Sequence, residues 1–525
     1  MALQITSPNP KALLRWLKTP VFWLFLVITI SLSYSWMSPQ ISAPNERSRI
    51  YLTMAVVDSG TLSLNEQIDK YGTPFDIAKR DGHFYSDKAP GSSFLAVPAF
   101  ALYRLLGGSD SIEKALIFMR LFVMVPFTLL GLVFLRKTLL GIGIRESIAN
   151  RTTVAYALGT SVFHYGAAFY GHALVASAAL GAALGIQRGL SSENPRARFC
   201  WRVFAGFSGG MAFAIEYQAA LICVGIAIAY LSVREHRTIT AVLAPALGAS
   251  VSVGATLVYN IFAFGGPFKT SYNFLFYNYS EEVHSKGLYG ITLPSAESVY
   301  GLLFSPSRGI ILCAPLVFVG ILALGAMWRH TRWLAIYIGF CAATFFLMAA
   351  GSSVWFGGWS FGPRLLVPIF GLTAIAAAAG LEELSDRPLL STLAHAYIAA
   401  GIAYNTLVTT AFPELPPRIT NPLQTVALPL FERGKPSPNL GMALLGLEGS
   451  ASVIPLALLI VAVIGYFLYQ RATPDRPPLW RRSIVAVSAV AVLFGTFVYE
   501  YPESDSAKSS QKFVKFLSSR RIDPK

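Results

Sequence analysis

The amino-acid sequence predicts an all-α polytopic membrane protein. Of its 525 residues, 54% are hydrophobic and only 13% are charged, whereas soluble domains carry roughly a quarter of charged residues. The mean hydropathy is +0.53. The apolar residues recur in runs of about 18–22 residues, each long enough to cross a hydrocarbon core of about 30 Å. A membrane β-barrel is not expected, because it shows short alternating segments instead.

Thirteen apolar runs predict thirteen transmembrane helices. They lie near residues 19–37, 115–135, 152–170, 172–187, 203–217, 219–233, 239–263, 309–328, 333–350, 365–381, 390–411, 452–470 and 483–499. The segment 90–108, PGSSFLAVPAFALYRLLGG, is apolar as well, but it is short and contains two prolines and Arg104. Counting it as a span breaks the alternation of the later loops, so we expect a juxtamembrane helix on the outer interface.

The charges of the loops predict the orientation of the chain. Seven short segments contain 20 Lys and Arg against 7 Asp and Glu: residues 11–18, 136–151, 188–202, 234–237, 329–332, 382–387 and 471–482. By the positive-inside rule these segments are cytoplasmic, which places the N-terminus inside and the C-terminus outside. They account for most of the net charge of +15, so that charge indicates topology and does not indicate a nucleic-acid partner.

Long segments on the predicted outer side are the expected location of function. They are residues 38–114, 264–308, 351–364, 412–451 and the tail 500–525. We expect a catalytic transmembrane module over residues 1–411. Residues 412–525 then hold an outer loop, the last two spans and an outer tail.

The first outer loop, 38–114, opens with PNERSRIYLTMAVVDSG. Ile50, Met54 and Val57 share one helical face, which predicts a helix with Asn45 as its N-cap and Gly60 at its end. Glu46 then lies in the first turn, where the helix dipole stabilises a negative charge. Stabilisation by the helix dipole is therefore one explanation for a glutamate at position 46, without any catalytic role.

The order of motifs in this region resembles that of the type-C glycosyltransferase (GT-C) superfamily. The first span, PNERSRIYLTMAVVDSGTL with its SG, the segment YSDKAPG and the apolar 90–108 segment follow one another in the same register. The similarity is to the lipid-carrier-dependent branch with the aminoarabinose transferases of lipid A and the protein O-mannosyltransferases. It is best over residues 19–240. It implies sugar transfer from a polyprenyl-phosphate carrier to a lipid, glycan or protein acceptor on the outer, periplasmic face of a bacterial inner membrane.

The resemblance also implies which residues act. The usual catalytic aspartate of the family corresponds here to Asn45, and an amide is no proton acceptor at neutral pH. Three outer carboxylates are therefore candidates for the base: Glu46, Asp58 and Asp87. Arg49, Lys88 and Arg364 are candidates for binding the departing phosphate. A catalytically silent relative of the superfamily is an alternative that Asn45 leaves open.

Four further residues lie in predicted spans or at their ends. His172 occupies a position where the family has a polar or acidic residue, and His164 lies one to two turns earlier, inside the span 152–170. Glu216, in AIEYQ, follows the fifth span, where relatives often have a lysine or an acid. Arg308, in SPSRG, precedes the eighth span, where a helix N-terminus favours anions. Each has a purely structural alternative, as an interfacial or snorkelling side chain.

The absence of several motifs narrows the chemistry. The sequence has no P-loop, HExxH, GxSxG or Rossmann GxGxxG. The predicted cytoplasmic loops are too short to fold a nucleotide-binding domain, so a cytoplasmic nucleotide-sugar donor is not expected. We expect no organic cofactor. The sequence does not indicate a metal site, although carboxylates near phosphates can bind a divalent ion such as Mg²⁺. The alternative function is a transporter or flippase of lipid-linked glycans, which predicts internal repeats and helices broken at mid-membrane, and the sequence shows no halfway repeat.

Overall fold

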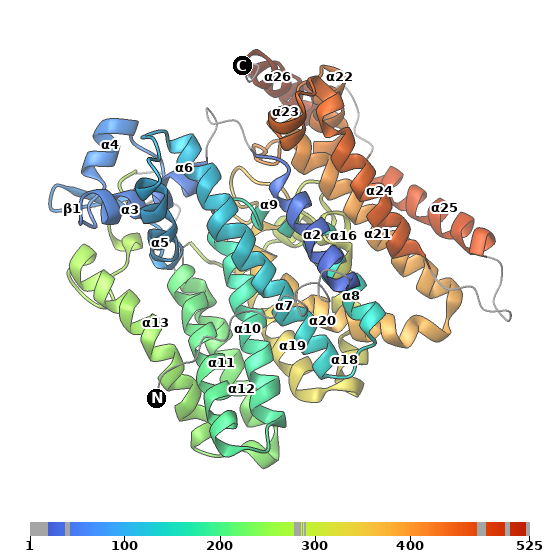
Figure 1. The fold of residues 1–525 in the computed structure, drawn as a ribbon, viewed down its shortest axis with the longest axis horizontal. Helices are drawn as coiled ribbons and strands as arrows, with labels where there is room; N and C mark the ends of the chain where they lie inside the picture. Colours follow the sequence, from blue (N-terminus) through green and yellow to red (C-terminus); the bar gives the residue numbers. More distant parts are fainter. Residues whose placement is uncertain are drawn as a thin grey trace.

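The computed structural model describes residues 19–36, 43–277, 285, 287, 290–469, 479–498 and 504–520. Most of these residues are helical (Figure 1). The predicted cytoplasmic segment 11–18, most of the segment 471–482, and parts of the outer segments 38–114, 264–308 and 500–525 lie outside the described residues.

The first outer loop folds as two helices, a hairpin and a third helix. These elements are α3 (Pro44–Asp58), α4 (Asn65–Tyr71), β1 (Ile77–Arg80), β2 (His83–Ser86) and α5 (Gly91–Leu105). They follow α2 (Pro20–Ser33), and β1 pairs with β2 in antiparallel register. The helix expected within residues 90–108 is confirmed as α5. The sequence analysis did not predict the hairpin.

The start of α3 differs from the prediction. The N-cap is Ala43 and Pro44 is the first helical residue, a position where proline costs no hydrogen bond. Asn45 therefore lies inside the helix, and its Oδ1 accepts a hydrogen bond of 2.9 Å from Arg49 Nε instead of capping the helix. Glu46 is in the first turn as predicted. The helix ends before Gly60, whose φ of +63° suits glycine.

The central bundle consists of helices between residues 112 and 411. They are α6 (Ile112–Met119), η2 (Arg120–Met124), α7 (Val125–Gly141), α8 (Glu146–Leu158), α9 (Val162–Tyr165), α10 (Gly171–Ser191), α11 (Pro195–Ile215), η3 (Tyr217–Ala219), α12 (Ala220–Ser232), η4 (Arg234–His236), α13 (Thr240–Phe264), η5 (Ser271–Asn273), α15 (Ala296–Phe304), α16 (Ile310–Cys313), α17 (Pro315–Leu322), α18 (Leu324–His330), α19 (Arg332–Gly351), η6 (Arg364–Leu366), α20 (Val367–Glu383), η7 (Leu384–Asp386) and α21 (Pro388–Ala411).

Among the described residues, six helical stretches are long and apolar enough to cross a membrane. They are Ile112–Gly141, Gly171–Ser191, Thr240–Phe264, Arg332–Gly351, Arg364–Asp386 and Gly449–Leu468. Two shorter apolar helices match the runs 19–37 and 219–233. The runs 203–217 and 390–411 coincide with α11 and α21, whereas 152–170 and 309–328 are divided into shorter helices. The chain is thus a multi-pass helical membrane protein, and the count of thirteen spans and their orientation stay predictions.

The remaining elements lie after residue 412. They are η8 (Leu423–Ala427), α22 (Leu428–Glu432), α23 (Leu440–Leu445), η9 (Gly449–Val453), α24 (Ile454–Leu468), α25 (Leu479–Val498) and α26 (Asp505–Arg520). The apolar face of α26 packs with the loop after α21, where Phe513 contacts Phe412 at 5.6 Å between ring centroids. Figure 1 shows α22, α23 and α26 at the same end of the bundle as α3 to α6.

Two glycines bring the first outer loop and the helix ends close together. A Cβ on Gly91, at the start of α5, would lie 2.6 Å from the backbone of Ala214 in α11. A Cβ on Gly171, at the start of α10, would lie 2.2 Å from Glu216 Oε1. Both distances are shorter than real Cβ contacts. A Cβ at position 91 would meet backbone atoms, so only glycine permits the approach there, whereas a Cβ at position 171 would force the Glu216 side chain to shift. The charged residues of the first outer loop consequently meet the ends of α10 and α11.

Candidate functional site

Glu46 and Arg120 form a buried ion pair at the start of α3. Arg120 Nη2 lies 2.8 Å from Glu46 Oε1 and 2.7 Å from Oε2, and Arg120 Nε lies 3.2 Å from Oε1. The backbone N–H of Phe169 donates a further hydrogen bond of 2.8 Å to Oε1. The side chain of Glu46 is 0% exposed. Three hydrogen bonds therefore end on Oε1 and one on Oε2.

Arg120 is the first residue of a π-helical turn that interrupts its helix. Residues Arg120–Met124 form a π-turn between α6 and α7, and such turns often occur at functional sites. The expected span 115–135 already contains this single arginine, and a charge at membrane depth needs a partner. That signal is present in the sequence, although Arg120 was not among the predicted site residues.

A second buried ion pair joins α3 to the end of α11. Arg49 Nη2 lies 2.5 Å from Glu216 Oε1, and Arg49 Nη1 also bonds the hydroxyl of Ser92 in α5. The side chain of Arg49 is 0% exposed. The structure thus brings together two residues that the sequence analysis proposed separately. Their contacts connect three elements of the site.

Lys88 lies between two carboxylates in the segment that joins β2 to α5. Its Nζ is 3.0 Å from Asp76 Oδ2 and 3.1 Å from Asp87 Oδ2. Burial raises the pKa of Asp87 to about 6, with Asp76 adding to the rise and Lys88 opposing it. Burial disfavours the charged form of Lys88, but the two carboxylates outweigh burial and raise its pKa. At neutral pH Lys88 is therefore an ammonium and the Asp87 carboxyl is ionised.

His172 lies at the start of α10 among aromatic rings. Its ring is stacked on Tyr170 at 6.3 Å and is edge-on to Tyr165 at 6.0 Å. It is 4% exposed, and neither ring nitrogen has a hydrogen-bond partner in the described part of the chain. The charges of Arg49, Lys88 and Arg364 all act on this ring. His172 is therefore an unpaired polar group surrounded by cations.

Arg364 reaches the same aromatic group from η6. Its guanidinium lies 5.6 Å from the centroid of the Tyr170 ring, within the range of a cation–π contact. Its Nε is buried and unpaired within the residues described. Arg364 thus retains hydrogen-bonding capacity for a ligand.

Glu414 completes the cluster from the loop after α21. It is 1% exposed and accepts a hydrogen bond of 2.9 Å from the hydroxyl of Tyr170. Burial, reinforced by the charge of Glu46, raises its pKa well above the usual range of a glutamate. Glu414 and Tyr170 were not predicted from the sequence, because PELPP between two spans has no distinguishing motif and the burial of Glu414 arises only from packing.

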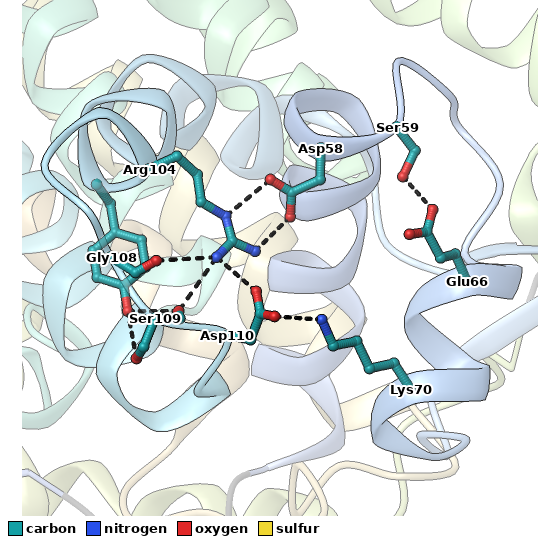
Figure 2. Close-up of polar contacts among 9 residues, drawn as sticks. Asp58, Ser59, Glu66, Lys70, Arg104, Gly108, Ser109 and Asp110 are labelled. Carbon is teal, nitrogen blue, oxygen red and sulfur yellow. Dashed lines mark hydrogen bonds and ion pairs between the residues drawn. The ribbon is translucent and has the colours of Figure 1, made fainter.

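Among the predicted site residues, Asp58 lies apart from this cluster, whereas Arg308 lies next to it, with Nη2 3.1 Å from the carbonyl oxygen of Leu415, which follows Glu414. Asp58 is at the other end of α3 from Glu46, about 18 Å along the helix axis. It pairs with Arg104 at 2.6 Å, in a network that continues through Asp110 to Lys70 (Figure 2). Arg308 bonds backbone carbonyls, with Nε 2.8 Å from Phe356 O. The guanidinium of Arg308 thus joins loops together.

Among the residues that the structure describes, no group of three or more His, Cys, Asp or Glu side chains is placed to hold a metal ion. The acidic side chains of the site lie beside basic or hydroxyl-bearing side chains. Each buried carboxylate named here faces an arginine, a lysine or a tyrosine hydroxyl.

No protein-family model and no curated protein sequence matches this chain. Similarity is found among solved structures. ArnT from Cupriavidus metallidurans, in the apo state, superposes with a TM-score of 0.50 at 16% sequence identity, over 93% of this chain and 78% of ArnT. The protein has a GT-C-like fold.

Two other solved structures give lower scores. The oligosaccharyltransferase of Archaeoglobus fulgidus matches with a TM-score of 0.47 at 11% identity, over 90% of this chain and 64% of that protein. The arabinosyltransferase EmbB of Mycobacterium smegmatis matches with a TM-score of 0.44 at 12% identity, over 99% of this chain and 42% of that protein. The GT-C-like fold agrees with the resemblance found in the first outer loop.

Proposed function

We propose that the protein is a glycosyltransferase that moves a sugar from a polyprenyl-phosphate carrier to an acceptor on the outer face of a bacterial inner membrane. The observation that carries this proposal is the buried group of cations with unused donors at one end of a GT-C-like bundle. The acceptor is a lipid, a glycan or a protein. The reaction as proposed needs no metal ion and no organic cofactor.

Lys88, Arg364 and His172 are the proposed ligands of the carrier phosphate. An ammonium group has three N–H donors, and two of those on Lys88 face Asp76 and Asp87. One donor on Lys88, the Nε of Arg364 and the ring of His172 remain for a ligand. Donors fixed in a water-poor site stabilise the charge that develops on a leaving phosphate.

Asp87 is the proposed catalytic base. Arg120 contacts both carboxylate oxygens of Glu46, whereas the ion pair of Asp87 with Lys88 uses Oδ2, and Asp87 has a pKa of about 6 and is ionised at neutral pH. In the reaction, the acceptor hydroxyl gives its proton to Asp87 and its oxygen bonds to the anomeric carbon. The bond between that carbon and the phosphate oxygen breaks, and polyprenyl phosphate leaves. Glu46 then has a positioning role through Arg120.

The comparison with ArnT supports the choice of carrier. ArnT from Cupriavidus metallidurans has also been solved bound to undecaprenyl phosphate. Its apo state shares the fold of this chain at a TM-score of 0.50. A polyprenyl phosphate is thus a suitable first ligand for testing the proposal.

The test uses purified full-length protein in liposomes with radiolabelled undecaprenyl-phosphate sugars. We expect undecaprenyl phosphate to bind and one of the sugars to be transferred. Lys88→Ala is expected to weaken binding of the carrier, and Asp87→Asn to abolish transfer while binding persists. Asp69→Asn, an exposed carboxylate in the same outer loop, is the matched control and should behave as wild type. Movement of labelled lipid across the bilayer without any sugar transfer would favour a flippase and contradict the proposal.

A further inference from the structure

A small cavity lies beside the Glu46–Arg120 pair, on the side of α2. Its wall contains Arg120, His164 of α9, Ala168, Thr409 of α21, and Ser35 at the end of α2. The space open to the centre of a water molecule is about 20 Å³. Roughly 10–15 Å³ on this measure holds one water, so the cavity accepts a group of the size of a single hydroxyl.

Three residues of this wall carry buried polar atoms with no hydrogen-bond partner in the residues described. They are the Oγ of Ser35, the Nε2 of His164 and the Oγ1 of Thr409. His164 is 6% exposed and Thr409 is 8% exposed. A buried polar group without a partner is costly, and native structures contain few of them. Their meeting at one cavity indicates that the wall is arranged for a polar ligand.

The charge around the cavity favours an uncharged ligand. Arg120 is the charged residue in the wall, and Glu46 balances it through three hydrogen bonds. A phosphate or an ammonium group has no free opposite charge to pair with there. A hydroxyl, by contrast, both donates and accepts hydrogen bonds. It can therefore pair with the hydroxyls of Ser35 and Thr409 and with the imidazole of His164.

The cavity adjoins the proposed phosphate site through an aromatic pair. Tyr165 contacts the ring of His164 at 4.6 Å and that of His172 at 6.0 Å. Tyr170 contacts both histidine rings at 6.3 Å. A sugar that leaves the phosphate near His172 is thus within a few side chains of the cavity.

We propose that this cavity is a subsite for one carbohydrate hydroxyl, held by Ser35, His164 and Thr409. The proposal rests on the proposed glycosyl transfer and adds to it a site of sugar discrimination. The hydroxyl belongs either to the donor sugar or to a glycan acceptor. Because the ligand chemistry is the same for both, the experiment separates the two sources.

The test compares Thr409→Val, which removes the hydroxyl but keeps the shape, with Ala168→Leu, which fills the cavity. Transfer is measured in liposomes, and KM is determined separately for the carrier-linked sugar and for the acceptor. We expect about a tenfold rise of one of the two KM values, the size of one lost hydrogen bond in a buried site. A rise in the donor KM identifies the donor sugar, and a rise in the acceptor KM identifies the acceptor. A donor or acceptor that lacks the matching hydroxyl should be insensitive to Thr409→Val.

Thr406→Val is the matched control, one turn earlier on α21. Its hydroxyl bonds the carbonyl of Ile402 at 2.8 Å and is not part of the cavity wall. Undecaprenyl phosphate binding is measured in every variant and is expected to stay at the wild-type level, which reports folding and the phosphate site together. If Ala168→Leu does not fold, Ser35→Ala takes its place.

Two results overturn the inference, and they are distinguishable. If wild type transfers sugar and both cavity variants leave both KM values unchanged, the cavity holds at most a structural water and the subsite is wrong. If wild type neither binds undecaprenyl phosphate nor transfers any carrier-linked sugar, the proposed function itself fails, and the subsite fails with it.

Discussion

Glu46 and Arg120 lie 74 positions apart in the sequence, and their side chains are in bidentate contact, with Arg120 Nη2 2.7 and 2.8 Å from the two carboxylate oxygens. The pair connects the first turn of α3 to the π-turn in a long apolar helix. It is buried, with side chains 0% and 11% exposed. Removing one partner of a buried ion pair leaves the other charge uncompensated and destabilises the folded protein.

Glu46→Gln is expected to lower stability strongly, because it leaves Arg120 buried without its counter-charge. Breaking such a pair typically costs about 3–5 kcal/mol. Thermal unfolding of the detergent-solubilised protein measures the effect. Glu383→Gln is the control, because its pair with Arg329 is exposed, and it should change little. A Glu46→Gln protein with wild-type stability and no transfer would instead assign the base to Glu46.

The activity is expected to depend on the ionisation of Asp87. Its pKa of about 6 means that the carboxyl is protonated below this pH and ionised above it. Because a base must be ionised, kcat should rise as the pH increases through about 6. Asp76→Asn removes a charge that raises the pKa of Asp87, so this variant should move the acid limb to lower pH. A limb that stays in place, or moves upward, would exclude Asp87 as its origin.

Ionisation of Glu414 is expected to weaken carrier binding as the pH rises through its raised pKa. Burial and the charge of Glu46 hold this pKa well above the usual range of a glutamate, so the carboxyl gains its negative charge only as the pH passes that raised pKa. The new charge lies close to Glu46 and competes with a phosphate for Arg364. Glu414→Gln keeps an acceptor for the Tyr170 hydroxyl but cannot ionise, so this pH-dependent loss of undecaprenyl phosphate binding should disappear.

Glu432→Gln, an exposed carboxylate on α22, is the control for the Glu414 experiment and should keep the wild-type pH dependence. The groups that interact with Glu414 are Glu46 on α3, Arg120 on η2, Tyr165 on α9, Tyr170 before α10 and Arg364 on η6. A loss of binding with rising pH that is identical in wild type and Glu414→Gln would exclude Glu414 as its origin.

Gly171→Ala is expected to displace Glu216. The added Cβ would lie 2.2 Å from Glu216 Oε1, which also bonds Arg49, so either α10 or Glu216 must move. Overpacking of this kind costs about 1–3 kcal/mol, measured as a loss of thermal stability. Gly339→Ala is the matched control in an apolar helix, where a Cβ meets no atom within 4 Å. It should leave stability unchanged or raise it.

Local patterns sufficed for several parts of the structure. Apolar runs predicted the multi-pass helical architecture, because the length and hydropathy of a span are properties of neighbouring residues. The position of Glu46 in the first turn of α3 and the helix within residues 90–108 are confirmed for the same reason. The N-cap was wrong because Pro44 can start a helix and the side chain of Asn45 has a better partner in Arg49.

The pairing of the charges could not be predicted from local patterns. Arg49 and Glu216 are 167 positions apart, and Tyr170 and Glu414 are 244 apart. Which carboxylate faces which cation depends on how closely the helix ends approach, and thus on contacts such as that of Gly171 with Glu216. Burial also follows from this packing, and burial is the main cause of the raised pKa of Asp87 and of Glu414. The sequence therefore specified the charged residues and their helices, while their partners and protonation followed from the packing of distant segments.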